Sequence, residues 1–341
     1  MEINTLEILR KNSLKQIDSL KPLVILITFL IPLLAIFGLK FKIGKMVFAS
    51  LFIPIFLYIW DMFKLYKTPK FKAELILYVA LFLVAGFILK NSLPFKLVAV
   101  VCLTGLSMLS IYKLIMKKVK EVKEQNFKDE FKDKFLKPYF DELGYSYEID
   151  TIGSNYIKNS RLFEESVDLL DYDNDKISGE NDGVWFGFGD VVLYDSKKEY
   201  EIWGVFFYAE FNKMANSNTF VISNDTTNQN SKKFRKITMD DSEFNSYFSV
   251  YTDDAQNAMY LLSPSLMRQL LNLKKRLKFP ISLSFVGDKI YIFTDTDKDS
   301  FEPDINKSVL KDNPAFAIKL ELSQFLAIVK TLNLNRKIWR V

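Results

Sequence analysis

The sequence of 341 residues has no histidine and a single cysteine, Cys102. Histidine is the commonest general base and a frequent metal ligand, and the usual zinc sites consist of cysteine and histidine. Ser-His-Asp sites, Cys-His sites and Cys/His zinc sites are therefore excluded within this chain. A single cysteine also excludes a disulfide framework, which fits a reducing compartment.

Glycine-rich nucleotide-binding motifs are lacking as well. The chain has 12 glycines, and none of them belongs to a Walker loop. Gly187-Phe188-Gly189 lies between two predicted strands and does not precede a helix, so it is a poor match to a dinucleotide-binding motif. From these absences we predict no catalytic residue, no metal ligand and no cofactor.

Positive charge is scarce in the C-terminal part of the chain. Residues 124–341 hold 28 Lys and Arg against 35 Asp and Glu, whereas residues 1–123 hold 18 against 6. Binding of nucleic acid needs a cationic surface that releases counterions from phosphate. We therefore expect no nucleic-acid partner, and we expect the basic N-terminal part to meet anionic lipid headgroups.

Long apolar stretches fill the N-terminal third, at about 22–39, 43–60, 75–89 and 97–116. A membrane-spanning helix needs about 20 residues, so the second and third stretches are short, and one of them could be re-entrant or interfacial. The first stretch lacks a small-x-small cleavage site, which favours a retained helix over a signal peptide. No ionisable residue lies in the middle of a stretch, which argues against a transport path.

Basic residues are unevenly placed around these stretches, and cytoplasmic loops carry the excess of Lys and Arg. The groups expected in the cytosol are Arg10, Lys11, Lys15 and Lys21; Lys64, Lys67, Lys70 and Lys72; and Lys117, Lys118, Lys120 and Lys123. The other two connections carry Lys40, Lys42 and Lys45, and Lys90 and Lys96. We therefore predict a multi-pass protein of a bacterial inner membrane whose N-terminal segment 1–21 and C-terminal domain face the cytosol. The third group, after the last stretch, is predicted to contact anionic lipids.

An amphipathic helix is predicted to connect the two parts over residues 117–143. Phe127, Phe131 and Phe135 recur every four residues with charged residues between them, which places them on one face. This face could pack on the core of the following domain or lie on the bilayer, and core packing is the more common use.

Residues 144–341 are predicted to form an α+β domain with a mainly antiparallel sheet and packed helices. The predicted strands are Val184–Tyr194, Glu201–Phe211, which is apolar on both faces, and Thr219–Ser223. Ile281–Val286 and Lys289–Thr294 form a hairpin closed by Gly287-Asp288. Ser263-Pro264 begins a helix, and a final helix is expected after Ser323.

Acidic clusters are the candidates for oxygen-ligated metal sites. Two of them follow a Ca²⁺-loop alternation, namely Asp171, Asp173, Asp175 and Asp182, and Asp295, Asp297 and Asp299. The first has Lys176 where an EF-hand needs glycine, so a solvated loop is favoured for both. Asp240, Asp241, Glu243, Asp253 and Asp254 could bind Mg²⁺, but Asp240 and Asp253 fit the first residues of helices better.

Several motifs together resemble a family of bacterial membrane-anchored proteins known only as a domain of unknown function. They are Phe206–Lys213, Val250–Asp254, Tyr260–Pro264, Ser284–Gly287, Phe301–Pro303 and Leu332–Trp339. The resemblance runs from about Phe127 to Val341 and implies an N-terminal membrane anchor with, typically, two helices. It implies no activity, so it supports the architecture and supplies no chemistry.

The polar residues of these motifs are the candidate binding residues: Glu210, Asn212, Lys213, Asp253, Asp254, Asn333, Asn335, Arg336 and Trp339. We expect the strand end at Glu210 to meet the C-terminal segment, with Arg336 as the charge partner of Glu210. Structural bracing is favoured over a ligand site, because buried polar groups need partners wherever they occur.

The leading hypothesis is a non-enzymatic binding or scaffolding domain with an unknown protein partner. A metal-dependent hydrolase that uses the acidic clusters and a small-solute transporter are the alternatives.

Overall fold

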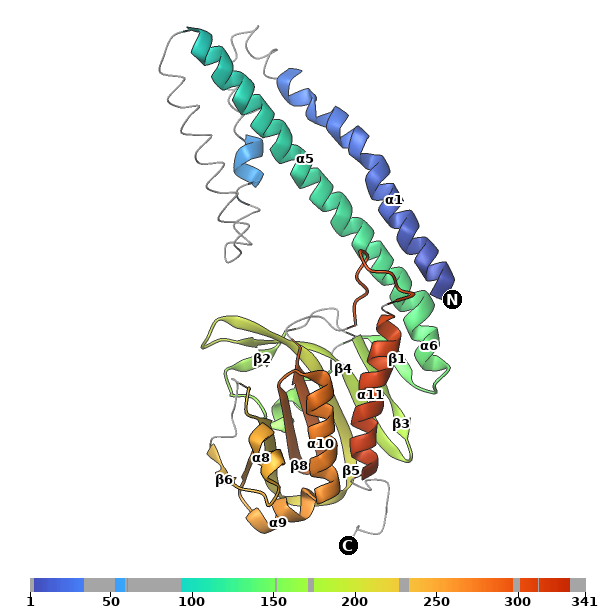
Figure 1. Cartoon of the computed structure of the whole chain (residues 1–341), viewed down its shortest axis with the longest axis vertical. Helices are drawn as coiled ribbons and strands as arrows, with labels where there is room; N and C mark the ends of the chain where they lie inside the picture. Colours follow the sequence, from blue (N-terminus) through green and yellow to red (C-terminus); the bar gives the residue numbers. More distant parts are fainter. Residues whose placement is uncertain are drawn as a thin grey trace. The chain divides into compact units, whose positions relative to one another are not determined.

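A computed structural model of the chain describes residues 3–33, 53–58, 60, 93–150, 152–170, 175–226, 233–296, 301–311 and 313–331 (Figure 1). The chain divides into two compact units. One consists of Ile8–Asp129 and holds the long helices, and the other consists of Met1–Glu7 with Glu130–Val341 and holds the sheet.

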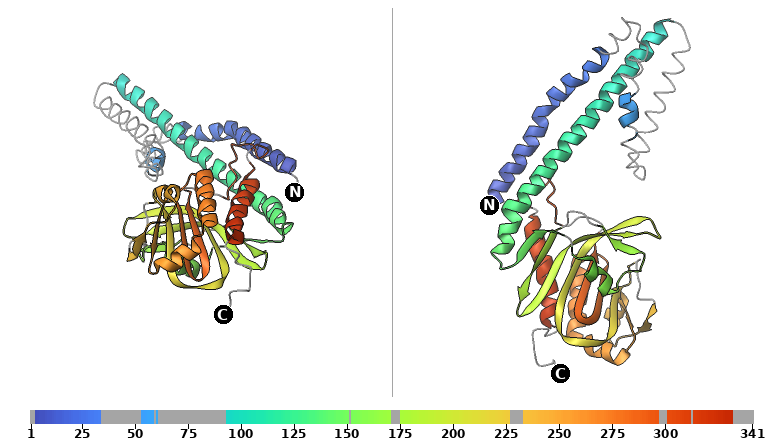
Figure 2. Two further views of the ribbon diagram at one scale, coloured as in Figure 1. Left: turned by 60° about the horizontal axis from the view of Figure 1, so that its bottom comes forward. Right: turned by 180° about the vertical axis from the view of Figure 1, so that it is seen from behind.

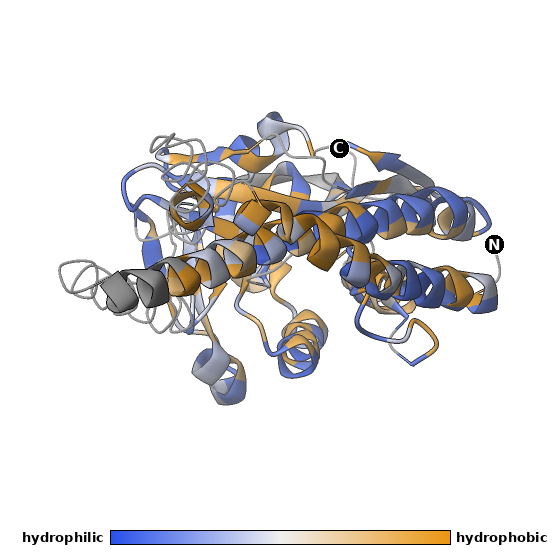
Figure 3. Ribbon diagram, turned by 90° about the horizontal axis from the view of Figure 1, so that it is seen from above, coloured by the Kyte–Doolittle hydropathy of each residue, from blue (hydrophilic) through white to orange (hydrophobic). Residues whose placement is uncertain are grey.

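Two helices dominate the described part of the first unit. Helix α1 spans Ile3–Thr28 and α5 spans Leu93–Phe131. The segment Ile3–Leu33 is long and apolar enough to span a membrane. Figure 3 shows that the long helices change along their length from hydrophobic to hydrophilic colouring.

The predicted membrane module maps onto these helices only in part. Helix α1 includes residues of both the expected N-terminal segment and the first apolar stretch. Most of the stretches at 43–60 and 75–89 lies outside the described residues. The fourth stretch at 97–116 continues without a break into the first part of the expected connecting helix, because α5 ends only at Phe131, and the rest of that segment is divided into a π-helix and a short α-helix.

The sheet of the second unit is antiparallel in every strand pair that the structure describes. The strands are β1 (Ser146–Ile149), β2 (Val167–Leu169), β3 (Asp175–Asn181), β4 (Val184–Asp195), β5 (Tyr200–Ser223), β6 (Arg235–Ile237), β7 (Phe248–Thr252) and β8 (Ile281–Asp295). Their order is β1-β3-β4-β5-β7-β6, with β2 also on β4 and β8 also on β5. With the packed helices, this confirms the predicted α+β class.

Strand β8 folds back on itself at the predicted Gly287-Asp288 turn. Gly287 has φ +61°, and Asp288 is not among the residues with positive φ, which is the pattern of a type II′ hairpin turn. The Asp295 N–H donates to the Pro280 carbonyl over 3.0 Å, and a hairpin closed at this turn places Pro280 opposite Asp295. The predicted hairpin is therefore confirmed.

Strand β5 surrounds this hairpin. Its residues 204–210 pair with 289–295, and its residues 219–222 pair with 282–285, with register shifts between the two blocks. The two blocks therefore lie on opposite sides of the β8 hairpin, and β4 and β7 extend the sheet outward from them.

Helices cover both faces of the sheet, as the views in Figures 1 and 2 show. They are η1 (Lys132–Leu136, a π-helix), α6 (Lys137–Asp141), α7 (Ser154–Ser160), α8 (Ser242–Tyr247), α9 (Ala255–Leu261), α10 (Pro264–Leu277) and α11 (Pro314–Thr331). The π-helix η1 directly follows α5 in the chain.

The centre of the sheet is apolar on both faces, as predicted for a central strand. On β5, Phe206 and Phe207 are both fully buried. Phe206 belongs to the core cluster that includes Ile157 of α7, whereas the Phe207 ring lies 5.3 Å from the ring of Phe325 in α11. Because neighbouring side chains point to opposite faces, α7 and α11 cover opposite faces of the sheet.

Two helix starts test the capping signals. Ser263 caps α10 as predicted, because its side chain accepts from Leu266 N over 3.4 Å and Pro264 takes the first helical position. The final helix begins at Pro314, so the predicted start after Ser323 is wrong. Asn313 accepts from Ala315 N over 3.1 Å, and proline is favoured in the first helical turn.

Candidate functional site

Helices α10 and α11 run side by side on one face of the sheet (Figures 1 and 2). A groove lined by polar residues lies between them. On α10 the apolar stripe of Leu266, Leu270 and Leu273 is buried. Gln269 and Arg276 lie beside this stripe at a spacing of seven residues, which places them on one side of the helix.

Helix α11 supplies the other wall. Ile318, Leu322 and Phe325 are buried, and the neighbouring Ser323 and Gln324 line the groove. The groove has a volume of about 280 Å³, close to the lower end of the roughly 300–1,000 Å³ that is typical of ligand pockets. Its lining residues are Gln269, Asn272, Leu273, Arg276, Ser323, Gln324 and Ala327.

Two residues that line this groove, Gln269 and Gln324, each carry a buried acceptor without a donor among the described residues. The Oε1 atoms of Gln269 and Gln324 are buried, and no donor among the described residues lies within hydrogen-bonding distance of either. The Gln324 amide nitrogen donates to the Leu320 carbonyl over 3.1 Å, which orients that side chain. A buried acceptor without a donor costs about 1–3 kcal/mol, so a ligand that donates hydrogen bonds to these atoms, once a side-chain rotation exposes them, would recover that cost.

A cluster of basic residues ends α10, where cations are favoured by the helix dipole. Lys274 lies 2.5 Å from Asp225 and donates to the Phe279 carbonyl. Lys275 pairs with Glu243 over 2.5 Å. For Arg276, no carboxylate of the described residues lies within ion-pair distance, and its guanidinium is the cation that lines the groove.

A second polar region lies inside the same unit and is named here the Lys132 cluster: Lys132, Tyr147, Asp175, Asp190 and Glu302. The Lys132 Nζ atom lies 2.9 Å from Asp175 Oδ2 and 2.6 Å from Glu302 Oε1. The Tyr147 hydroxyl donates to Asp175 Oδ1, and the Asp175 N–H donates to Asp190 Oδ1 over 2.7 Å. Lys132 and Asp175 are only 6% and 1% exposed.

Burial sets the titration of this cluster. It raises the pKa of Asp175 to about 6, against the opposing effects of the Lys132 charge and the Tyr147 hydrogen bond. Burial alone would lower the pKa of Lys132, but attraction to Asp175 and Glu302 raises it above its ordinary value. Burial and the neighbouring Asp175 also raise the pKa of Tyr147. The ammonium of Lys132 is therefore charged throughout the physiological pH range, and Asp175 is the group that titrates near neutral pH.

The Asp175 contacts correct the solvated-loop interpretation of the first acidic alternation. Asp175 is buried against Lys132 and is not a loop residue in water. Asp171 and Asp173 lie outside the described residues, as do Asp297 and Asp299. Among the described residues, no group of three or more acidic or sulfur side chains is arranged to hold a metal ion.

The predicted first residues of two helices, Asp240 and Asp253, are each wrong by one position. Asp241, not Asp240, caps α8 by accepting from Phe244 N over 3.0 Å. Asp254, not Asp253, caps α9 by accepting from the backbone N–H groups of Gln256 and Asn257. In both pairs the second carboxylate lies next to the helix.

The Asp253 carboxylate has another role. Its two oxygens accept from the backbone N–H and the side-chain amide of Asn218, each over 2.9 Å. The Arg161 guanidinium donates to the Asn218 side-chain oxygen over 3.3 Å. Asp253 and Asn218 thus join the ends of β7 and the second block of β5.

Glu210 has a cross-strand partner. Its carboxylate lies 3.4 Å from the Lys289 Nζ atom, directly opposite on β8. The expected partner Arg336 lies outside the described residues, together with Asn333, Asn335 and Trp339. The structure does not describe the side chains of Asn212 and Lys213, so their joint role stays a prediction.

The four lysines expected at the membrane surface form ion pairs or hydrogen bonds along the helices. Lys117 and Lys118 lie 4.0 Å and 2.7 Å from Glu121, and Lys120 lies 3.4 Å from Glu124. Lys123 donates to Gln16 of α1 over 2.7 Å. These exposed pairs are weak.

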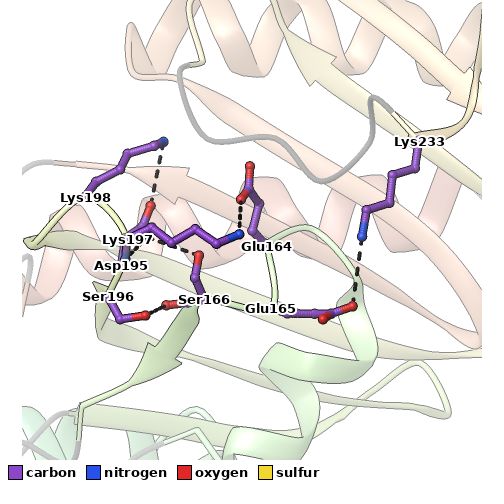
Figure 4. Close-up of polar contacts among 8 residues, drawn as sticks. All are labelled: Glu164, Glu165, Ser166, Asp195, Ser196, Lys197, Lys198 and Lys233. Carbon is purple, nitrogen blue, oxygen red and sulfur yellow. Dashed lines mark hydrogen bonds and ion pairs between the residues drawn. The ribbon is translucent and has the colours of Figure 1, made fainter.

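A third polar network supports the turn between β4 and β5 (Figure 4). Asp195 accepts from the Ser166 hydroxyl and the Lys197 N–H. Burial would raise the pKa of Asp195, but these hydrogen bonds lower it below its ordinary value. The ion pairs Lys197–Glu164 and Lys233–Glu165 are exposed, so the network reads as turn stabilisation.

Sequence reasoning missed both main polar regions. The Lys132 cluster joins residues far apart in the chain, and no sequence motif of neighbouring residues predicts it. Only its members Asp175 and Glu302 were within motifs that the sequence singled out. The groove had a usable signal, because Gln269, Asn272 and Arg276 recur at helical spacing beside the leucine stripe of α10.

Comparison with known proteins gives a family-model match for part of the C-terminal domain. No curated protein matches the sequence. Among solved structures, the crystal structure of the mycobacterial trehalose monomycolate transport factor A, TtfA, aligns with a TM-score of 0.34 at 7% identity, covering 57% of this chain and 93% of that one. Residues 201–334, which include α10, α11 and the groove, match the family model described as "Protein of unknown function (DUF3137)", and the resemblance to a domain of unknown function is thereby confirmed for these residues.

Proposed function

We propose that this chain is a non-enzymatic binding module of a bacterial inner membrane, held there by its own apolar helices, with the domain in the cytosol. The observation that supports binding is the α10–α11 groove, which has two buried acceptors without described donors and one arginine. The apolar segment Ile3–Leu33 supports the membrane anchor.

The groove chemistry favours a short polypeptide segment that carries a carboxylate. The Oε1 atoms of Gln269 and Gln324 accept hydrogen bonds, and backbone N–H groups of an extended peptide are donors of suitable strength. The Arg276 guanidinium presents a planar set of donors that matches a carboxylate. A volume of about 280 Å³ accommodates a peptide end better than a large cofactor.

Binding can be tested by equilibrium dialysis of the full chain in mild detergent against a mixture of random tetrapeptides, read by mass spectrometry. We expect retention of peptides with a free carboxyl terminus and loss of the same peptides when that end is amidated. Arg276→Ala should weaken binding about tenfold or more, because an ion-paired hydrogen bond contributes about 1.5–3 kcal/mol.

Arg268→Ala is the matched control, because Arg268 is on α10 but does not line the groove. It should bind peptides as the unchanged chain does. Equal weakening by the two substitutions, or equal retention of amidated peptides, would reject the groove as a carboxylate site.

The proposed topology has four spans and both termini in the cytosol. It is supported by the lysines around the apolar stretches. A reporter that is active only outside the cytosol, fused after Val341, should stay silent, and strong activity would overturn the orientation.

Contact with anionic lipid is proposed for Lys117, Lys118, Lys120 and Lys123, where each basic residue contributes on the order of 1 kcal/mol. Replacing all four by glutamine should weaken salt-sensitive association of the full chain, in detergent, with vesicles that contain anionic lipid. Because three of these lysines already pair with Glu121 or Glu124, we expect less than the full additive effect. Unchanged, salt-insensitive association would contradict the proposal.

A further inference from the structure

The Lys132 cluster connects three parts of the domain that are distant in sequence. Lys132 comes from the π-helix η1, Tyr147 and Asp175 come from the paired strands β1 and β3, and Glu302 comes from the segment between β8 and α11. Helix α6, which continues η1, packs on β1. The ion pairs of Lys132 therefore attach η1, and with it α6, to the sheet.

Asp175 is the centre of this attachment. Lys132 and Tyr147 both contact its carboxylate, from η1 and β1. Two further carboxylates surround it, because Glu302 shares the Lys132 ammonium and Asp190 of β4 accepts from the Asp175 backbone. Like charges close to a buried carboxylate favour its protonated form.

We propose that the Lys132 cluster is a proton-controlled contact that holds η1 and α6 on the sheet more firmly in acid than at neutral pH. Local opening of this contact lets water reach Asp175, whose pKa then falls toward its ordinary value. Protons therefore bind the closed form more tightly than the open form, and by linkage acid favours the closed form.

The size of the effect follows from the pKa change. With a pKa of about 6 in the closed form and about 3.9 in the open form, the closed-to-open ratio rises about tenfold between pH 7 and pH 5. Because Lys132, Phe135 and Leu136 of η1 are buried, amide hydrogen exchange in this segment reports the opening.

The experiment is hydrogen exchange with mass spectrometry on the full chain in mild detergent, with rates corrected for the intrinsic effect of pH. Peptides that cover Lys132–Asp141 should gain about tenfold protection from pH 7 to pH 5. Asp175→Asn should remove this gain, whereas Asp168→Asn, which changes an exposed carboxylate on β2, should retain it. An equal gain in Asp175→Asn, or none in the unchanged chain, would overturn the proposal.

A second variant keeps the test decisive if Asp175→Asn does not fold. The Tyr147 hydroxyl donates a hydrogen bond to Asp175, and this bond lowers the pKa of Asp175. Tyr147→Phe removes the bond, so the pKa of Asp175 should rise. The midpoint of the protection change should therefore move to higher pH. A midpoint that stays in place or moves lower would contradict control by Asp175.

Discussion

The Lys132 cluster and the α10–α11 groove are polar regions of the same domain, but their polar atoms differ in their partners. In the cluster, a buried ammonium contacts two carboxylates and a tyrosine completes the set. In the groove, two buried acceptors have no donor among the described residues. A buried cation shared by carboxylates holds separate elements of a fold together, whereas a buried acceptor that lacks a donor and has no cation beside it is suited to recognition.

The largest effect is expected from Lys132→Met. This change keeps the aliphatic volume but leaves Asp175 and Glu302 buried without their shared cation. Breaking a buried ion pair on one side costs about 3–5 kcal/mol, which corresponds to a melting temperature lower by roughly 6–20 °C. Thermal unfolding of the full chain in mild detergent, followed by circular dichroism, measures it.

Lys134→Met is the control for this prediction. Lys134 lies two residues away and forms an exposed pair with Glu130, so its loss should cost under about 1 kcal/mol. Similar melting temperatures for the two variants would remove the distinction between the buried cluster and ordinary surface charge.

The second-largest effect is expected in the pH dependence of stability, which should depend on the Lys132 cluster and not on the α10–α11 groove. The pKa of Asp175 is raised in the folded state, so its protonation contributes stability at low pH that is lost as pH rises through about 6. Relative to Asp175→Asn, the unchanged chain should gain about 1 kcal/mol in free energy of unfolding between pH 7 and pH 5. Denaturant titrations at the two pH values measure the gain.

Arg276→Ala provides the comparison from the groove. Arg276 is outside the cluster, so this variant should show the same gain as the unchanged chain. The assignment to Asp175 would be contradicted if Arg276→Ala lost this gain. It would also be contradicted if the unchanged chain became less stable in acid and Asp175→Asn removed that loss.

Gln269→Leu should change stability less than Lys132→Met does, and it should stabilise the domain where Lys132→Met destabilises it. The substitution replaces a buried acceptor that lacks a described donor by an apolar group of similar size. We expect stability to rise by up to about 1 kcal/mol, or roughly 2–4 °C, while peptide retention falls. A stability gain with loss of function is typical of residues kept for binding. Destabilisation with intact peptide retention would instead indicate a structural role for Gln269.

The smallest effect is expected from Lys118→Ala on α5. Its pair with Glu121 is exposed and lies one helical turn away, and such pairs contribute about 0.2–0.5 kcal/mol. The melting temperature of the full chain should change by no more than about 2 °C. A larger loss would show that surface charge on this helix matters for the fold, and would weaken the contrast drawn with the Lys132 cluster.

One turn and one helix cap are local features that the sequence predicted well. The Gly287-Asp288 hairpin and the Ser263 cap each depend on a few adjacent residues with a defined hydrogen-bonding geometry. The consecutive apolar residues around Phe206 and Phe207 correctly predicted a strand buried on both faces. These features are determined within short segments of chain.

The errors arose where distant residues decide the outcome. Asp253 and Asp254 are both able to cap a helix, and Asn218 of β5 engages the first of them. Asp175 lies in an acidic motif that suggests solvent, yet Lys132 draws its carboxylate inside the domain. The start of α11 at Pro314 was missed because Phe316 and Leu320 are exposed, which obscures the apolar period expected of a packed helix.

The length of α5 has a consequence for a chain at a membrane. Its 39 residues, at about 1.5 Å per residue, make a rod of about 58 Å. The hydrocarbon core of a bilayer is about 30 Å thick, and in the proposed four-span topology the apolar half of α5, up to Met116, would span it. The remaining residues of α5, 117–131, make a rod of about 22 Å, which is long enough to pass through the headgroup layer and several ångströms beyond. The helix thereby acts as a spacer of fixed length, and deleting seven residues, about two turns, would shorten its reach by about 10 Å with little change in the direction its faces point.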